Sequence, residues 1–360
     1  MAELAATYHA QGRYDEVEEI SVKVLDLRRE VVGEKHPHTI RSMADLAATY
    51  HAQGRYDEAE KLKDEALALR REVLGEKHPD TIWSMAELAA TYHNQGRYGE
   101  AEEISVKVLD LRRKMLGEKH PDTIWSMASL AATYHAQGRY DEAEKLKDEA
   151  LALRREVLGE KHPHTIRSMA ELAATYHAQG RYDEVEKLKD EALELRREVV
   201  GEKHPDTIWS MADLAATYHA QGRYGEAEKL KDEALALRRE VLGEKHPDTI
   251  WSMAELAATY HNQGRYDEAE KLKDEALALR REVLGEKHPH TIRSMAELAA
   301  TYHNQGRYGE AEEISVKVLD LRRKMLGEKH PDTIWSMASL AATYHAQRRY
   351  KEAGHSIRPL

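Results

Sequence analysis

The sequence contains no cysteine, no phenylalanine and no long apolar run. The absence of cysteine excludes disulfide bonds, thiol catalysis and cysteine-ligated zinc, and it fits a reducing compartment such as the cytoplasm. No stretch approaches the roughly 20 apolar residues that a membrane-spanning helix needs. A secretory signal peptide is not expected either, because Met1 opens directly on an amphipathic helical pattern. We therefore expect a soluble cytoplasmic protein that does not engage a membrane.

Positive charge is also in deficit. The formal net charge is −11, and lysine and arginine are interspersed with aspartate and glutamate rather than gathered in a basic stripe. A phosphate backbone would be repelled on average, so nucleic acid is not an expected partner. Apolar residues make up 41% and charged residues 33% of the chain, which is typical of a folded helical protein rather than a disordered one.

A repeat organises the whole chain. Methionine recurs every 42 residues from Met1 to Met337, which gives eight full repeats and a partial ninth over residues 337–360. No residues are left over for linkers between the repeats. The sequence therefore predicts a single continuous array over residues 1–360.

Each repeat has the signals of two helices. Pro37 suits the first position of a helix because it lacks an N–H group, and Gly54 suits the left-handed conformation that ends one. The spacing of Asp57 and Glu60 is that of a capping box, which predicts that the second helix starts at Asp57. Gly75 then ends the second helix. Because the turn between the two helices is short, we expect them to pack antiparallel.

Apolar residues recur at three- and four-residue spacing in both helices. In the first helix these are Ile40, Met43, Leu46, Ala47 and Tyr50. In the second helix they are Ala59, Leu62, Ala66, Leu69 and Val73. The opposite side of the second helix is expected in solvent and carries Glu60, Lys61, Lys63, Asp64, Glu65, Arg70 and Arg71. One hairpin cannot bury its apolar faces alone, so neighbours must stack. We predict an all-α fold, a right-handed superhelical solenoid of antiparallel helix pairs with a concave inner surface.

The repeat resembles the 42-residue tetratricopeptide repeat of kinesin light chains and of many fungal and bacterial NB-ARC or NACHT proteins. The residues that carry the resemblance are Leu46, Ala47, Tyr50, Gly54, Tyr56, Ala59, Ala66, Leu67 and Leu69, with the loop L-G-E-K-H-P-D-T. Lys63 departs from the pattern because it replaces the usual aromatic residue, and we expect looser packing there. The resemblance implies a protein-interaction scaffold. It also leaves open that the chain is the sensor portion of a larger NB-ARC or NACHT-type protein.

The resemblance implies that the first helices line the inner surface. At the fifth position of these helices, tryptophan and arginine alternate along the array, and alanine and histidine follow on the same side by helical spacing. Tryptophan and arginine are enriched in binding hot spots. The predicted peptide-binding groove comprises Arg41, Trp83, Ala86, Ala90, His93, Asn94, Trp125, His135, Arg167, His177, Trp209, His219, Trp251, His261, Asn262, Arg293, His303 and Asn304. The alternative is that each tryptophan fills a gap between neighbouring repeats, but a core position would not easily accept arginine.

Neither a metal site nor a catalytic site is expected. Histidines recur from His9 to His345, but neighbouring helices pack about 8 to 10 Å apart, whereas zinc needs nitrogen ligands at about 2 Å. Protonation of these histidines near pH 6 is expected to add positive charge to the groove. No unique constellation breaks the symmetry of the repeats as a catalytic site would, so we expect no enzyme and no cofactor.

The predicted function is a non-enzymatic scaffold that binds a peptide or helical segment with apolar, aromatic and some acidic side chains. The alternative is a structural, self-associating or engineered array without a specific ligand. Neither end of the array carries the polar cap that solenoids usually need, which predicts head-to-tail self-association. Residues 85–137 and 295–347 are identical, which is typical of recent duplication.

Overall fold

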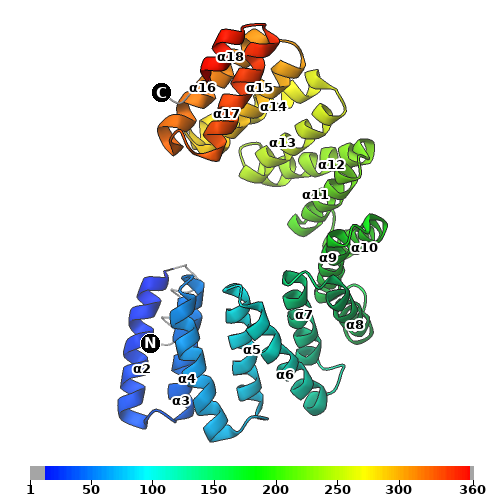
Figure 1. The fold of residues 1–360 in the computed structure, drawn as a ribbon. Helices are drawn as coiled ribbons and strands as arrows, with labels where there is room; N and C mark the ends of the chain where they lie inside the picture. Colours follow the sequence, from blue (N-terminus) through cyan, green and yellow to red (C-terminus); the bar gives the residue numbers. More distant parts are fainter. Residues whose placement is uncertain (1–12, 357–360) are drawn as a thin grey trace. The chain divides into compact units, whose positions relative to one another are not determined.

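The computed structural model describes residues 13–356, which form 17 helices and no strand. First and second helices of the repeats alternate along the chain (Figure 1). The first helices of the repeats are α3 (Pro37–Ala52), α5 (Pro79–Asn94), α7 (Pro121–Ala136), α9 (Pro163–Ala178), α11 (Pro205–Ala220), α13 (Pro247–Asn262), α15 (Pro289–Asn304) and α17 (Pro331–Ala346). The second helices are α2 (Tyr14–Val32), α4 (Tyr56–Leu74), α6 (Tyr98–Leu116), α8 (Tyr140–Leu158), α10 (Tyr182–Val200), α12 (Tyr224–Leu242), α14 (Tyr266–Leu284), α16 (Tyr308–Leu326) and α18 (Tyr350–Ser356). The predicted all-α fold of antiparallel helix pairs is confirmed.

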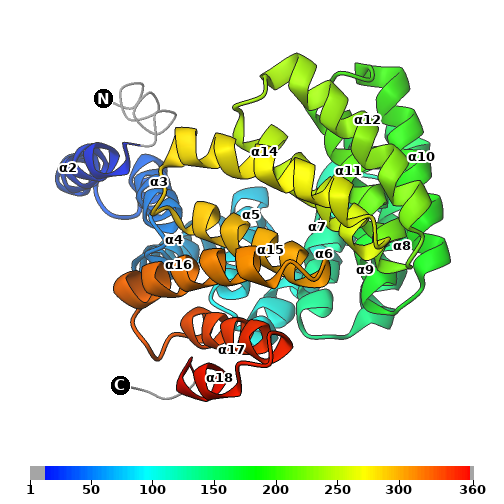
Figure 2. The same ribbon diagram turned by 90° about the horizontal axis from the view of Figure 1, so that it is seen from above.

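The helices belong to two compact units, residues 1–181 and residues 182–360. Within each unit, every helix packs against the next one along the chain. In the second unit, for example, α14, α15, α16 and α17 follow one another side by side in both views (Figures 1 and 2). One copy of the identical segment lies in each unit. That all repeats form one continuous right-handed superhelix stays a prediction.

The helix ends follow from local chemistry. Pro37 occupies the first turn of α3 as expected, and the preceding residue, His36, caps the helix because its Nδ1 accepts a hydrogen bond from His38 N at 3.2 Å. Gly54 has a φ of +76°, which confirms the left-handed conformation expected there. The predicted capping box is wrong. The second helix begins at Tyr56, and the side chain of its N-cap residue, Arg55, makes no capping hydrogen bond.

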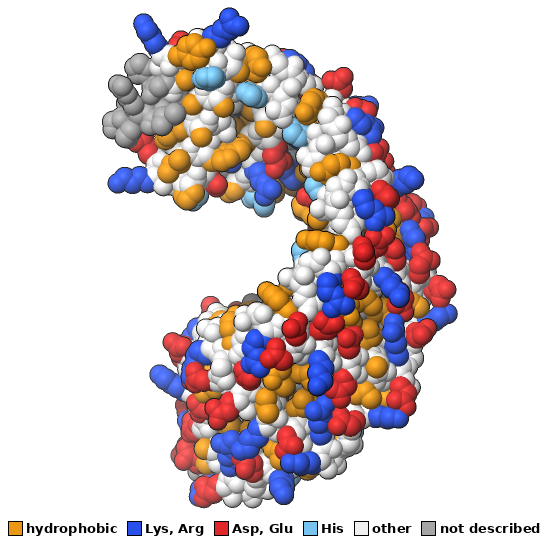
Figure 3. All heavy atoms as spheres, turned by 45° about the vertical axis from the view of Figure 1, so that its right-hand side comes forward, with side chains coloured by type: hydrophobic (Ala, Val, Ile, Leu, Met, Phe, Trp, Pro, Cys, Tyr) orange, Lys and Arg blue, Asp and Glu red, His pale blue; other side chains and the backbone are white. Residues whose placement is uncertain are grey.

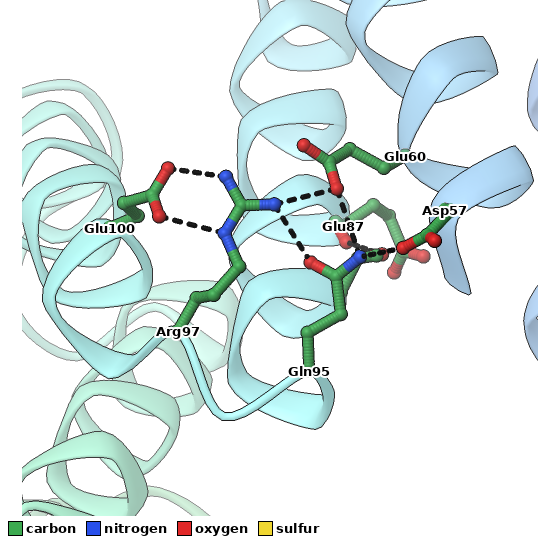
Figure 4. A network of polar contacts seen from close by, with 7 residues as sticks. Asp57, Glu60, Glu87, Gln95, Arg97 and Glu100 are labelled. Atoms are coloured by element: carbon green, nitrogen blue, oxygen red, sulfur yellow. Dashed lines mark hydrogen bonds and ion pairs between the residues drawn. The ribbon is translucent and has the colours of Figure 1, made fainter.

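Glu60 instead links two repeats. Its carboxylate accepts hydrogen bonds from Arg97 Nη1 at 2.7 Å and from Gln95 Nε2 at 2.9 Å, both of which come from the turn after α5 (Figure 4). Burial raises the pKa of Glu60, but these hydrogen bonds outweigh it, so the net shift is downward. Arg97 also stacks on Tyr92, with its guanidinium carbon 4.2 Å from the ring centroid. The same glutamate-to-arginine link recurs in both units, for example between Glu228 and Arg265.

The core of each pair lies between successive helices. Around α7 it comprises Leu109, Ile124, Met127, Leu130 and Ala150. The predicted apolar stripe of the second helix is wrong at its last residue, because Val73 is 43% exposed.

The opposite side of that helix also differs from the prediction. Lys63 and Arg70 are buried rather than solvated. Lys63 does not loosen the packing, because its Nζ donates to Glu87 O at 3.0 Å and to Thr91 Oγ1 at 2.9 Å on the next first helix.

Charges of both signs cover the rest of the surface. On the first unit, the face shown in Figure 3 carries lysine and arginine side chains interspersed with aspartate and glutamate, without a patch of one sign. None of the helices in the described part of the chain is both long and apolar enough to cross a membrane.

Candidate functional site: the exposed face of the first helices

The tryptophans of the first helices are exposed in both units. The exposed fraction of the side chain is 46% for Trp83, 45% for Trp125, 54% for Trp209, 46% for Trp251 and 53% for Trp335. A surface that leaves large aromatic side chains half in solvent at the same place on successive helices is unusual for a monomer. We call this surface, formed by the fifth position and the residues that follow it at helical spacing, the first-helix face.

Each tryptophan rests on an arginine of the preceding second helix, which is buried or half-buried. The guanidinium carbon of Arg70 lies 5.5 Å from the centroid of the Trp83 ring, and Arg112 lies equally far from Trp125. Arg70 is itself fixed, because its Nη1 donates to Ser84 Oγ and to the carbonyl oxygen of Asp80 on the helix that carries the tryptophan. A cation over an aromatic face contributes about 0.5 to 1 kcal/mol at an exposed site. The arginines therefore hold the indole rings in place.

Arginine at the same position is exposed as well. Arg41, Arg167 and Arg293 all lie in solvent. Arg167 Nε donates to Glu171 Oε1 at 3.0 Å, and Arg293 Nε donates to Glu297 Oε1 at 2.9 Å. A glutamate on the same helix therefore already engages these two guanidinium groups.

The remaining predicted residues extend from solvent to the protein interior. Among the predicted site residues other than tryptophan and arginine, those in solvent are Asn94, His177, Asn262 and Asn304. Those that are half-buried are Ala90, His93, His135, His219, His261 and His303. Ala86 is buried. The alanines thus form part of the base of the surface, and the tryptophans and arginines stand above it.

Asparagine at the end of a first helix contacts the histidine of the preceding first helix. Asn94 Nδ2 lies 2.7 Å from His51 Nε2, and Asn304 Nδ2 lies 2.7 Å from His261 Nε2. Burial is the main cause that lowers the pKa of His51 and of His93 below its usual range. These side chains stay neutral to a lower pH than solvated histidines do, so the gain of positive charge at these two positions is displaced toward acid.

Metal binding has no supporting geometry. Within residues 13–356, no group of three or more histidine, aspartate or glutamate side chains is placed to hold a metal ion. His36 and His38 have ring centroids 5.2 Å apart, but they supply only two ligands, and His36 Nδ1 is engaged as a helix cap.

Two cavities in this face were not predicted. One opens between α5 and α7 and the other between α15 and α17, where Ser105 and Ser315 stand in place of the buried lysine. Trp125 and Trp335 line them. The available signal was the block I-S-V-K-V-L-D followed, 24 residues after its serine, by a second serine; the third copy of the block, at residues 20–26, is followed by Asp45 instead.

The sequence matches the model of the tetratricopeptide repeat along nearly its whole length. The matched segments are residues 1–72, 44–114, 86–146, 122–194, 171–238, 213–280, 253–324 and 295–353. No protein of curated function matches the sequence.

Several solved structures are similar. A candidate kinesin light chain from Podosopora anserina with nearly identical TPR-like repeats is 31% identical, with a TM-score of 0.53 over 57% of this chain and 97% of that one. BtubC from P. vanneervenii is 22% identical, with a TM-score of 0.56 over 65% of this chain and 94% of that one. A signal transduction ATPase with a tetratricopeptide repeat sensor, from Pyrococcus horikoshii, is 16% identical, with a TM-score of 0.59 over 94% of this chain and 52% of that one. The last two likenesses concern the fold alone.

Proposed function

Because the chain belongs to the tetratricopeptide repeat family, we propose that it is a non-enzymatic scaffold that holds a peptide or helical segment of a partner protein. The bound segment lies along the first-helix face, in the concave groove predicted from the sequence. The observation that carries this proposal is the recurrence of half-exposed tryptophan, 45% to 54% in solvent, at one position of successive first helices. A cytoplasmic location is part of the proposal and is supported by the absence of cysteine.

Immobilised indole rings are suited to binding. A tryptophan that a partner covers contributes a large contact area. A side chain that is already ordered before binding loses less conformational entropy when the partner binds. The stacking of Trp83 on Arg70, and of Trp251 on Arg238 at 5.4 Å, provides this order before binding.

The partner segment should carry apolar or aromatic side chains and some acidic ones. The aromatic contacts are expected to dominate, because a partner carboxylate must compete with Glu171 for Arg167 and with Glu297 for Arg293. Removal of the tryptophans should therefore weaken binding more than removal of these arginines.

A peptide library passed over the full-length chain tests the proposal. The test variant combines Trp125→Ala, Trp209→Ala and Trp251→Ala. The matched control combines Val106→Ala and Val316→Ala, which truncates residues that are 45% exposed on the second helices and do not line the cavities beside the tryptophans. We expect the control to retain the peptides of the intact chain and the tryptophan variant, with unchanged circular dichroism, to lose them. Equal retention by both variants would contradict binding at the first-helix face.

Self-association is the second candidate function, and one observation favours it. Ile334 is 54% exposed, whereas the equivalent Ile82 is 3% exposed. Within the described part of the chain α18 has 7 residues, whereas α6, which packs against α5, has 19. A second copy could cover this apolar end. Light scattering should then show oligomers that Ile334→Asp dissociates, and a monomer at high concentration would exclude this function.

A further inference from the structure

Two cavities with equivalent linings open on the first-helix face, one in each unit. The cavity between α5 and α7 has a volume of about 150 Å³, and the one between α15 and α17 has a volume of about 160 Å³. Alanines of one first helix and the tryptophan of the next form the walls. Ser105 and Val108 of the second helix form the floor of the first cavity.

In other repeats a lysine occupies this space. Lys63 Nζ donates to Thr91 Oγ1 at 2.9 Å, and Lys231 Nζ donates to Thr259 Oγ1 at 3.0 Å. Thr133, which lines the first cavity, is the equivalent threonine. The same contact is made by Lys147, Lys189 and Lys273.

An acidic residue accompanies each of these lysines 24 positions later, as Glu87 accompanies Lys63. In the two cavity repeats, serine replaces both members of the pair. Ser129 follows Ser105, and Ser339 follows Ser315. The short serine side chains leave empty the volume that the lysine fills elsewhere.

The floor of each cavity carries an unused hydroxyl group. Ser105 and Ser315 are each 7% exposed and line the cavities. Among the hydrogen bonds formed by the described residues, none involves either hydroxyl. In the second cavity, His303 Nε2 is buried without a hydrogen-bond partner. A ligand that brings a hydrogen-bonding group to the floor can engage these groups.

The size and chemistry of the cavities select the occupant. An apolar cavity of about 150 Å³ is large enough for a benzene ring. We propose that each cavity binds the side chain of a tyrosine from a partner peptide. The ring lies between the tryptophan and the alanines, and the phenolic hydroxyl bonds to the hydroxyl of Ser105 or Ser315. Lysine closes the equivalent site in the repeats that carry it. This inference rests on the proposed peptide-binding function and specifies which repeats read the peptide.

The probe for the test is p-cresol, which has the structure of the tyrosine side chain. Its binding to the full-length chain is followed by saturation-transfer NMR. The closed variant combines Ser105→Lys, Ser129→Glu, Ser315→Lys and Ser339→Glu, and it reproduces a lysine–glutamate pair that the chain already has in four repeats. We expect the intact chain to bind p-cresol and the closed variant to lose the signal while its melting temperature does not fall. An undiminished signal in the closed variant, or no signal with the intact chain, would overturn the proposal.

Two further variants test the parts of the proposal separately. Lys63→Ser with Glu87→Ser should open a third site and increase the p-cresol signal. Ser105→Ala with Ser315→Ala keeps the space but removes the hydroxyls, so p-cresol should lose its advantage over toluene. If p-cresol and toluene bind the intact chain equally, the role of the serine hydroxyl is wrong.

Peptide binding and p-cresol binding distinguish this inference from the proposed function. If library peptides bind the closed variant as well as the intact chain, and their binding depends on the tryptophans, the scaffold function is supported and the proposal of tyrosine-binding cavities is wrong. If p-cresol enters the cavities but no peptide is retained, the pockets stand and the proposed scaffold function fails.

Discussion

Arg348 stands where every other described repeat has glycine in the turn between its helices. Its φ is +62°, and the turn keeps its usual hydrogen bonds, such as Arg349 N to Tyr344 O at 2.9 Å. A residue with a Cβ atom in this left-handed conformation costs about 1 kcal/mol. We therefore expect Arg348→Gly to stabilise the last repeat by about 1 kcal/mol, measured by urea unfolding.

The reverse change is the control. Gly306 has a φ of +78°, and a Cβ atom at this position would have no neighbouring atom within 4 Å. Gly306→Ala should therefore lower the free energy of unfolding by about 1 kcal/mol, for conformational reasons alone. A destabilised Arg348→Gly variant would contradict the assignment of strain to this residue.

Two buried charged residues could not be predicted from the sequence. Helical spacing predicts Lys63 and Arg70 in solvent, because they are charged and lie opposite the apolar stripe. Their partners lie in the next repeat, at Thr91 for Lys63 and at Ser84 for Arg70. Helical periodicity describes one helix at a time, so it could not reveal that a long side chain spans the gap to another one. The cavities at Ser105 and Ser315 were missed for the same reason.

At the scale of the helix, Leu130 tests the packing of α7. It is 4% exposed and packs in one cluster with Leu109, Ile124 and Met127. Leu130→Ala should destabilise by about 2 to 5 kcal/mol, because it removes buried apolar atoms and leaves a cavity. Val106→Ala is the control, since Val106 is 45% exposed and surface changes stay within about 0.5 kcal/mol. Equal melting of the two variants would contradict the assigned core.

The half-buried histidines give stability a pH dependence. Burial is the first cause that lowers the pKa in five of them, His51, His93, His135, His219 and His261. As pH falls below the usual histidine pKa of about 6.5, the unfolded chain takes up protons that the folded chain does not, so stability decreases.

The melting temperature should therefore fall between pH 7.5 and about 5.5, a window above the titration of the carboxylates. A variant with glutamine at all five positions should show a flatter dependence. The same fall in that variant would exclude these histidines as the cause.

The helices themselves were largely predictable. The spacing of Ile40, Met43 and Leu46, the proline at the start and the glycine at the end agree on one first helix, and the structure confirms it. The start of the second helix was missed because the Asp57 and Glu60 pattern has two uses. A glutamate three residues after an aspartate can cap a helix, but here Glu60 binds Arg97 of the following repeat.

At the scale of the whole molecule, the same exposed arrangement of a tryptophan on an arginine recurs from repeat to repeat. Trp83 and Trp125 in the first unit, and Trp209, Trp251 and Trp335 in the second, stand half exposed on stacked arginines. The replacement of tryptophan by arginine at the same position predicted that these tryptophans lie on the surface. The structure gives their exposed fractions, and we propose that they bind the partner.

Photo-cross-linking of a peptide library tests that claim most directly. The photoreactive residue p-benzoylphenylalanine replaces Trp251 on the first-helix face in one chain and Val316, which is 45% exposed on a second helix, in another. We predict that peptides rich in apolar and aromatic residues are captured at position 251 and not at position 316. Capture that is equal at both positions, or stronger at position 316, would contradict the proposal that this protein binds its partners through the first-helix face.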